Sequence, residues 1–181
     1  DRLLQIIDEE KITVLKITPS ILAMMYRRNR SKTIKTLRGV RALVLGGERI
    51  NVKHIEPLLS NNPGLTIINH YGPCETTIGC CMKIIDANSM ASYKINTSIG
   101  KPFANNSIII VDQNFTEVVD GKQGKLLIQG PSVGCGYINV EDDSNRFLMY
   151  NGKPAFLTSD IGFYNCDHEL SLIGRDESVV K

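Results

Sequence analysis

Segment 69–77 gathers chemically different side chains directly after an apolar run. The run, residues 65–68, predicts a short buried strand. Gly72 and Pro73 then predict a turn, because glycine tolerates unusual backbone angles and proline fixes φ. Ligands of open α/β sheets bind at strand ends, so the segment is a candidate ligand site, and a polar strand-to-helix turn is the alternative. An amide, an aromatic ring, a thiol and a carboxylate occupy it, on Asn69, Tyr71, Cys74 and Glu75.

The surrounding elements predict an α/β part followed by a β-rich part. In residues 1–95, apolar runs alternate with helical patterns, which is typical of a parallel sheet. The strands are expected at 12–17, 42–45 and 65–68, and the helices at 3–8, 19–28 and 52–59. Residues 96–173 carry short β-rich runs between turns of Gly, Asn and Asp, which predict a small antiparallel barrel or curled sheet. These runs are 107–111, 125–129, 157–158, 162–164 and 170–173.

Composition excludes several classes of protein. Apolar residues make up 42% and charged residues 22% of the 181 residues, values that allow a real core and argue against disorder. A net charge of +2 gives no reason to expect nucleic acid as a partner. We also expect no membrane partner, because neither a membrane-length apolar run nor a signal peptide is present. The five cysteines form no pairing or zinc-ligand pattern, so we expect reduced thiols and a cytoplasmic location.

The segment 69–77 resembles the YGPTE motif of AMP-forming adenylation domains, the amino-acid-activating units of nonribosomal peptide synthetases. Further signatures of that family follow a common order along residues 11–181. They are the glycine-rich turn at 46–48, IGRP…VLD at 99–112, GELxIxG…ARGY at 124–137, TGD at 158–160 and GRxD at 174–177. The resemblance implies the α/β fold class: part of a parallel or mixed sheet with flanking helices, then a small distorted β-barrel.

In that family a C-terminal lid swings about a hinge. The resemblance therefore assigns 174–181 to the start of the hinge, with Glu177 as the residue about which the lid rotates. The family's phosphate loop normally lies upstream of this segment, and the lid lysine lies downstream. We expect the segment by itself to be inactive, because it lacks both.

The implied reaction joins an amino acid to ATP with Mg²⁺, forms aminoacyl-AMP and releases pyrophosphate. The aminoacyl group then passes to the phosphopantetheine thiol of a peptidyl carrier protein, among neighbouring synthetase modules. By resemblance, Glu75 and Arg175 are catalytic, and Glu75 also binds Mg²⁺, an ion that prefers hard oxygen ligands. The residues implied to bind ATP or AMP are Gly46, Gly47, Glu48, Asn69, Tyr71, Cys74 and Asp160. Alternatively, Glu75 is a helix-start carboxylate, and Asp160 and Arg175 are surface charges.

Five positions depart from the family pattern. Cys74 replaces a threonine, Lys125 a glutamate and Ser159 a glycine, and Gly134-Cys135 replaces Ala-Arg. A catalytically degenerate nucleotide-binding remnant is therefore one alternative function. An acyl- or aryl-acid:CoA ligase of the same superfamily is another.

The amino acid pocket of similar domains points to a substrate. Lys16 lies in an apolar run, where an unpaired ammonium is costly to bury, so it either awaits an anionic partner or faces outward at a sheet edge. His70 offers a second donor to an anion. Together the pocket positions resemble those of aspartate-activating domains, so L-aspartate is the expected substrate, with asparagine or glutamate next. These positions are Lys16, Val44, Gly46, His70, Ile78 and Gly79.

Overall fold

The structure is a computed structural model that describes residues 2–138 and 146–176. The described chain divides into two compact units. The first unit contains the chain through His70 and the segment Lys83–Thr97, and the second contains Tyr71–Met82 and the chain from Ser98 onward. The division falls inside strands β3 (Thr66–Tyr71) and β4 (Cys81–Ile85).

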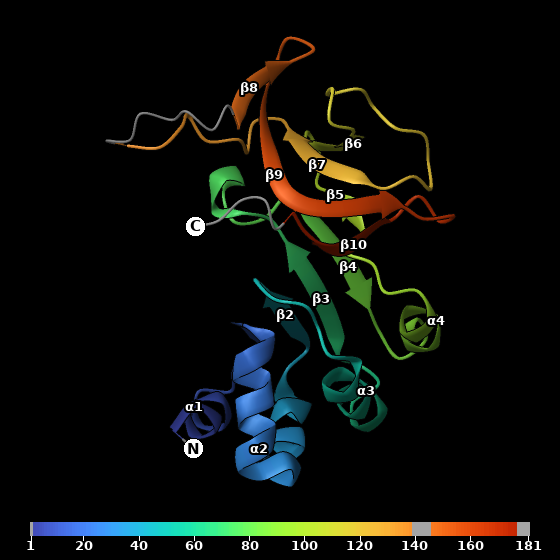
Figure 1. Ribbon diagram of the computed structural model, residues 1–181. Helices are drawn as coiled ribbons and strands as arrows, with labels where there is room; N and C mark the ends of the chain where they lie inside the picture. The colour runs from blue at the N-terminus through green and yellow to red at the C-terminus, as the bar shows by residue number, and fades with distance from the viewer. Residues whose placement is uncertain (1, 139–145, 177–181) are drawn as a thin grey trace. The chain divides into compact units, whose positions relative to one another are not determined.

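The first unit is an α/β layer (Figure 1). Strands β1 (Val14–Ile17), β2 (Ala42–Gly46) and β3 pair in parallel, and β4 lies beside β3 in the same sheet. The parallel sheet predicted from the alternating pattern is thus confirmed. The helices are α1 (Arg2–Glu9), α2 (Pro19–Thr36), α3 (Val52–Asn61) and α4 (Met90–Ile95), with a short 3₁₀ turn, η1 (Leu37–Gly39).

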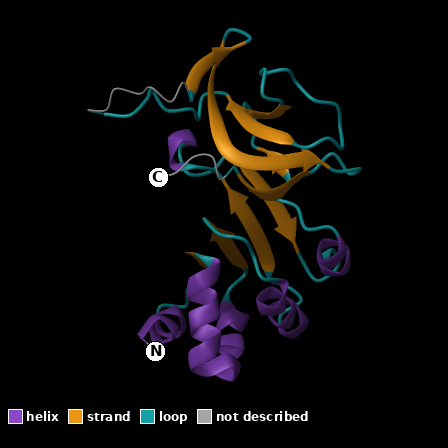
Figure 2. Cartoon of the chain, in the orientation of Figure 1, coloured by secondary structure: helices purple, strands orange, loops and turns teal. Residues whose placement is uncertain are grey.

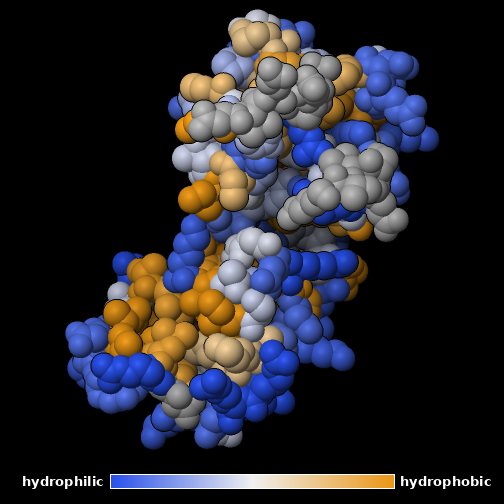
Figure 3. Space-filling view, turned by 60° about the vertical axis from the view of Figure 1, so that its left-hand side comes forward, coloured by the Kyte–Doolittle hydropathy of each residue, from blue (hydrophilic) through white to orange (hydrophobic). Residues whose placement is uncertain are grey.

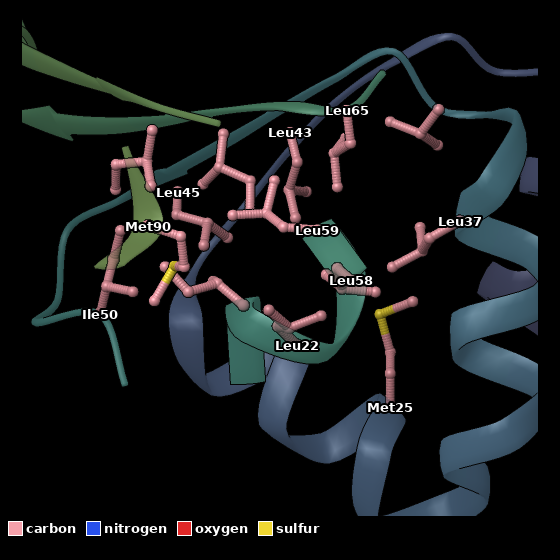
Figure 4. Close-up of a cluster of buried hydrophobic side chains, with 14 of the residues drawn as sticks. Leu22, Met25, Leu37, Leu43, Leu45, Ile50, Leu58, Leu59, Leu65 and Met90 are labelled. Carbon is pink, nitrogen blue, oxygen red and sulfur yellow. The ribbon is translucent and has the colours of Figure 1, made fainter. Parts of the chain in front are cut away.

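One face of this sheet packs against the helices and forms the core shown in Figure 4. Leu43, Leu45 and Ile67 are fully buried there, because alternate strand residues point to the same face. They meet Leu22 from α2 and Leu58 from α3. Full burial of each such side chain contributes about 1.5–3 kcal/mol, and this apolar contact holds the helices on the sheet.

Helix α2 begins at Pro19, as predicted, but runs past the predicted end at Arg28 to Thr36. Its backbone leaves the helical region at Asn29, with φ −161° and ψ 94°. The Asn29 side-chain oxygen accepts a hydrogen bond of 2.9 Å from the Lys32 N–H, which caps the second part of the helix. The periodic pattern therefore changes phase at Asn29, and the prediction ended there. Neither α2 nor another helix in the described ranges is long and apolar enough to cross a membrane.

The second unit is a curled antiparallel sheet with strand order β10-β9-β7-β6, to which β8 adds by pairing with β9. The strands are β6 (Ser107–Val111), β7 (Gly124–Gln129), β8 (Phe147–Tyr150), β9 (Lys153–Tyr164) and β10 (Leu170–Arg175). The short β5 (Lys101–Pro102) pairs with Cys81 and Met82. In the described part of this unit, Figure 2 shows no helix apart from the 3₁₀ turn η2 (Cys74–Thr76). The predicted barrel-like part is confirmed.

The predicted strands 157–158 and 162–164 were wrong as separate elements, because β9 runs unbroken from Lys153 to Tyr164. The polar residues Thr158, Ser159 and Asp160 interrupt the apolar pattern in the sequence. In the structure Thr158 and Ser159 are only 4% and 6% exposed, since β7 and β10 flank this strand. Polar groups are seldom buried inside a strand without a partner, and the hydroxyls of Thr158 and Ser159 both take part in hydrogen bonds.

Candidate functional site

A linked set of three side chains joins the end of β3 to strands β9 and β10 in the second unit. The Tyr71 hydroxyl donates a hydrogen bond of 2.6 Å to Oδ2 of Asp160. The other carboxylate oxygen, Oδ1, lies 3.2 Å from Nε of Arg175. Asp160 and Arg175 are direct partners in the β9–β10 register. The structure thus brings together three of the residues singled out from the sequence.

Neighbouring hydroxyls complete this set. The Asp160 N–H donates to Oγ1 of Thr158 at 3.0 Å, which fixes the backbone at the carboxylate. Nη2 of Arg175 donates to Oγ of Ser159 at 2.7 Å. The Asp160 side chain is 17% exposed and that of Arg175 is 66% exposed, so the carboxylate is held inside while the guanidinium faces outward. An outward guanidinium beside a fixed carboxylate suits a ligand that carries both hydroxyl and phosphate groups.

Burial controls protonation at this site. Burial raises the pKa of Tyr71 far above its ordinary value, and the nearby negative charge of Asp160 raises it further. The hydroxyl therefore stays protonated and remains a donor to the carboxylate at neutral pH. Burial also raises the pKa of the neighbouring Cys80 thiol to about 11, so this cysteine stays a neutral thiol.

Glu75 lies in η2, on the turn that follows β3. One oxygen of its carboxylate, Oε1, accepts a hydrogen bond of 2.7 Å from the Tyr137 hydroxyl. Its backbone carbonyl accepts another, of 2.8 Å, from the Gly134 N–H. The segment that follows β7 thus holds both the backbone and the side chain of Glu75. The Tyr137 ring is itself packed edge-on against Phe147 at 5.2 Å between centroids.

The turn around Glu75 depends on close backbone packing. A Cβ added at Gly72 would lie 2.7 Å from the carbonyl oxygen of Ile78, so only glycine fits there. Thr77 and Ile78 have φ values of 59° and 71°, in a region that side chains with a branched Cβ rarely adopt. Strain of this kind is frequent at ligand sites. The Thr77 hydroxyl donates to the Ser132 carbonyl at 2.8 Å and helps to hold the turn.

The glycine-rich turn belongs to the first unit. A Cβ at Gly46 would lie 2.8 Å from the His70 carbonyl oxygen, so β2 and β3 require glycine at this point. Gly47 has φ 82°, which glycine adopts without strain. The Glu48 carboxylate accepts hydrogen bonds from Ser20, 2.9 Å from the backbone N and 2.8 Å from Oγ. Glu48 therefore stabilises the first turn of α2 in the described chain.

Asn69 and His70 point to opposite faces of β3. Asn69 is 7% exposed, and its Nδ2 donates to the Tyr93 hydroxyl at 3.2 Å on the side of α4. His70 shares the other face with Lys16 and Val44, as the registers of β1, β2 and β3 require. Partial burial lowers the pKa of His70, and the positive charge of Lys16 lowers it further.

Lys16 is exposed on the edge strand β1. The sequence left two alternatives for this lysine, and its exposure fits the second, an outward-facing position at a sheet edge. Two apolar side chains of the same sheet are also half exposed: Val14, on β1, is 50% exposed, and Ile84, on β4, is 52% exposed. Figure 3 shows hydrophobic surface gathered on the unit that carries the four helices. We name the face of β1 to β4 that bears Lys16 and His70 the open face.

The remaining predicted residues lie in the second unit or outside the described residues. Cys74 is exposed, Ile78 is 61% exposed and Gly79 is half-buried. The predicted hinge residue Glu177 falls outside the described residues. Sequence reasoning did not single out Tyr137 as a partner of Glu75. The only signal for it was its place in the GY pair of the ARGY-like stretch.

The donor set at Glu75 fits Mg²⁺ held together with phosphate oxygens. Within residues 2–138 and 146–176, no group of three or more His, Cys, Asp or Glu side chains could hold a metal ion. Proteins commonly bind Mg²⁺ through one or two carboxylates, with water and substrate phosphates supplying the other ligands. The single, partly exposed carboxylate of Glu75 matches that mode and does not match a closed all-protein metal site.

Comparison with known proteins places the chain in a family. The family of AMP-binding enzymes matches residues 1–138. Bacitracin synthase 3 of Bacillus licheniformis is 33% identical over 99% of this chain and 3% of its own length. The D-alanine–D-alanyl carrier protein ligase of Streptococcus pyogenes is 32% identical over 75% of this chain and 26% of its own.

Among solved structures, the nonribosomal peptide synthetase protein PA1221, which contains adenylation and PCP domains, is similar over 99% of this chain. The TM-score is 0.84, the sequence identity 26%, and the match covers 36% of that chain. The chain thus spans only a small part of these relatives. The common fold and the match over residues 1–138 establish that the chain belongs to the family of AMP-binding enzymes.

Proposed function

We propose that the chain is part of an amino-acid-activating adenylation domain. In the first half-reaction, a carboxylate oxygen of the amino acid attacks the α-phosphorus of ATP. The bond to the bridging oxygen breaks, pyrophosphate leaves and aminoacyl-AMP forms. In the second, the phosphopantetheine thiol of a carrier protein attacks the acyl carbon and AMP leaves. Both steps unite groups that repel or react slowly in water, so positioning and electrostatic stabilisation are the main requirements.

The observation that carries this proposal is the linkage of Tyr71, Asp160 and Arg175. A buried carboxylate with one donor already bound is oriented to accept hydrogen bonds from ribose hydroxyls. The exposed guanidinium of Arg175 can donate to ribose or to the α-phosphate through its planar fork. The Tyr71 ring supplies an apolar face for adenine, while its hydroxyl holds Asp160 in place. Asn69 is proposed for the adenine edge on the resemblance alone, because its Nδ2 donates to the Tyr93 hydroxyl.

Glu75 is the residue that would hold Mg²⁺. The ion, when bound, neutralises phosphate charge, and its remaining ligands come from water and the phosphates of ATP. Tyr137 orients the carboxylate through the 2.7 Å hydrogen bond to Oε1 and leaves Oε2 available. Cys74, at the position of a threonine in similar domains, offers a weaker donor to phosphate than a hydroxyl would.

For the substrate we propose L-aspartate. Lys16 and His70 lie on the open face with Val44, and the effect of Lys16 on the pKa of His70 supports a shared electrostatic environment. The proposal requires that the rest of the adenylation domain cover the open face. Half-exposed Val14, two residues before Lys16 on β1, supports such a cover, because its apolar surface is removed from water only if another part of the protein packs on it. A β-carboxylate between Lys16 and His70 would then be desolvated and strongly bound.

A carrier protein is the proposed partner of the second half-reaction, among neighbouring synthetase modules. The names of two relatives support it, since one is a carrier protein ligase and the other contains a PCP domain. A reducing compartment such as the cytoplasm is proposed because all five cysteines are free.

The test is amino-acid-dependent ATP–pyrophosphate exchange by the complete adenylation domain that carries this segment. We expect exchange with aspartate to exceed that with asparagine, glutamate and large apolar amino acids. Loading of a carrier protein, compared with formation of free acyl-CoA, separates this function from that of a CoA ligase. ATP binding without exchange for any of the proteinogenic amino acids would instead support a degenerate nucleotide-binding protein, the alternative that Cys74, Lys125 and Ser159 favour.

A further inference from the structure

The end of strand β10 is held by contacts from β9, its neighbour, and from β7, the next strand of the same sheet. Nζ of Lys125, on β7, lies 2.7 Å from Oδ2 of Asp176. Ser159, on β9, contributes twice: its carbonyl accepts a 2.7 Å hydrogen bond from the Asp176 N–H, and its hydroxyl accepts one from Nη2 of Arg175, also of 2.7 Å. Ser159 therefore holds both Arg175 and Asp176, and Lys125 holds Asp176 as well.

These contacts are partly shielded from water. The Lys125 and Asp176 side chains are 35% and 22% exposed, so their attraction is screened less than that of a fully exposed pair. Lys125 is the register partner of Ile161, and Arg175 is the partner of Asp160. The ion pair and the Arg175–Asp160 contact thus lie in adjacent rows of the same sheet.

Lys125 and Ser159 are two of the positions that depart from the family pattern. A glutamate at position 125 would set a carboxylate against that of Asp176, and the two charges would repel each other. A glycine at position 159 would remove the hydroxyl that accepts from Arg175. Both departures therefore act on the same segment of this chain, and each supplies a contact that the family residue cannot make.

We propose that Lys125 and Ser159 are positioning residues that hold Arg175 against Asp160. The Arg175 side chain is 66% exposed, and a guanidinium so exposed loses its orientation without nearby partners. Ser159 fixes the guanidinium directly. The Lys125–Asp176 pair fixes the backbone that carries the guanidinium, at the residue that follows Arg175. The consequence for nucleotide binding rests on the proposed function of Arg175, whereas the consequence for local opening does not.

The experiment uses the whole protein that carries this segment and measures two quantities. The first is hydrogen exchange of the amides at Arg175 and Asp176, which reports local opening whatever the enzyme does. The second is the KM for ATP in pyrophosphate exchange. We expect Lys125→Glu to speed exchange at these amides about tenfold and to raise the ATP KM several-fold, with a smaller effect on kcat.

Reversal of both charges is the decisive rescue. Lys125→Glu combined with Asp176→Lys should restore slow amide hydrogen exchange and the low KM for ATP, because the ion pair is rebuilt with opposite polarity. Lys122→Glu is the matched control, since it makes the same charge change at an exposed loop position of the same unit. If Lys125→Glu fails to fold, Lys125→Gln removes the attraction without adding repulsion. Ser159→Gly should also raise the KM for ATP, although it leaves the charges of Lys125 and Asp176 in place.

Unchanged amide exchange in Lys125→Glu and Lys125→Gln would overturn the proposal. Faster exchange with an unchanged ATP KM in an active enzyme would overturn the role in positioning Arg175. If the unmodified protein shows no ATP–pyrophosphate exchange with any amino acid, the proposed function fails. The amide hydrogen exchange measurements still decide whether Lys125 and Ser159 hold the segment.

Discussion

The hydroxyl of Tyr71 and the carboxylate of Asp160 are joined by a hydrogen bond of 2.6 Å, although 89 positions separate them in the chain. The bond ties the end of β3 to the middle of β9. Because the pKa of Tyr71 is strongly raised by burial and by the charge of Asp160, the hydroxyl stays protonated and keeps donating over the whole physiological pH range.

Tyr71→Phe should weaken ATP binding while keeping the aromatic face. Removing the donor leaves a carboxylate that is only 17% exposed with one fewer partner, which costs about 1–3 kcal/mol. We expect the free energy of unfolding to decrease by an amount within that range. The ATP KM should rise about tenfold. Tyr164→Phe is the matched control, because its hydroxyl donates to the Ile108 carbonyl in the same unit. An equal KM change in both variants would refute a specific role for Tyr71.

Tyr137→Phe should raise the Mg²⁺ concentration that gives half-maximal activity. The phenyl ring preserves the contact with Phe147, and the hydrogen bond to Glu75 is lost. Loss of a group that orients a metal ligand typically lowers metal affinity about 10–100-fold, and an exposed site lies at the lower end. Mn²⁺ binding followed by electron paramagnetic resonance, with ATP present, measures the affinity without relying on turnover. Unaltered Mn²⁺ affinity would mean that Tyr137 merely packs on the turn.

Lys16→Ala should reduce aspartate-dependent pyrophosphate exchange by on the order of 30-fold or more. Truncating one partner of a desolvated charge pair typically costs roughly 2–5 kcal/mol. The KM for ATP should change little, since Lys16 is assigned to the amino acid and not to the nucleotide. A neutral amino acid should then compete better. The aspartate assignment fails if the complete domain leaves Lys16 in water or prefers a large apolar amino acid.

His70 should titrate below the ordinary histidine pKa, because partial burial and then the charge of Lys16 oppose its protonation. The unfolded chain takes up this proton at higher pH than the folded chain does. His70 therefore contributes stability above the ordinary pKa, and that contribution is lost as the pH falls through the lowered value. In Lys16→Ala, histidine NMR should show the pKa moving only part of the way back, because burial is the larger cause. No movement at all would refute the coupling.

The cysteines should divide into two reactivity classes. Cys74, Cys135 and Cys166 are exposed, whereas Cys80 and Cys81 are fully buried. Burial also raises the pKa of both buried thiols, that of Cys80 to about 11, and thiolates are the reactive form. Iodoacetamide at pH 8 should modify the three exposed residues in the native protein and all five after denaturation, as counted by mass spectrometry. Native labelling of Cys80 would show that this part of the chain opens readily.

The sequence by itself determined the class of the fold and the main members of the site. Short apolar runs that alternate with helical patterns predicted the parallel strands. This works because the residues that a strand or helix buries recur along the sequence at the period of that element. The turn after β3 was predictable because Gly72 and Pro73 restrict the backbone locally. Asp160 and Arg175 were found by their motifs. No property of either residue alone indicated that they face each other.

Tertiary structure decided what local patterns cannot encode. It placed Asn69 and His70 on opposite faces of β3, made one long strand of β9 and brought Tyr137 to Glu75 across 62 positions. It also joined Lys125 to Asp176, and so turned an apparent departure from the family pattern into a contact. These pairings depend on strand register and loop closure between distant segments, whose free energies are set by the whole packed chain and leave no periodic signal in the sequence.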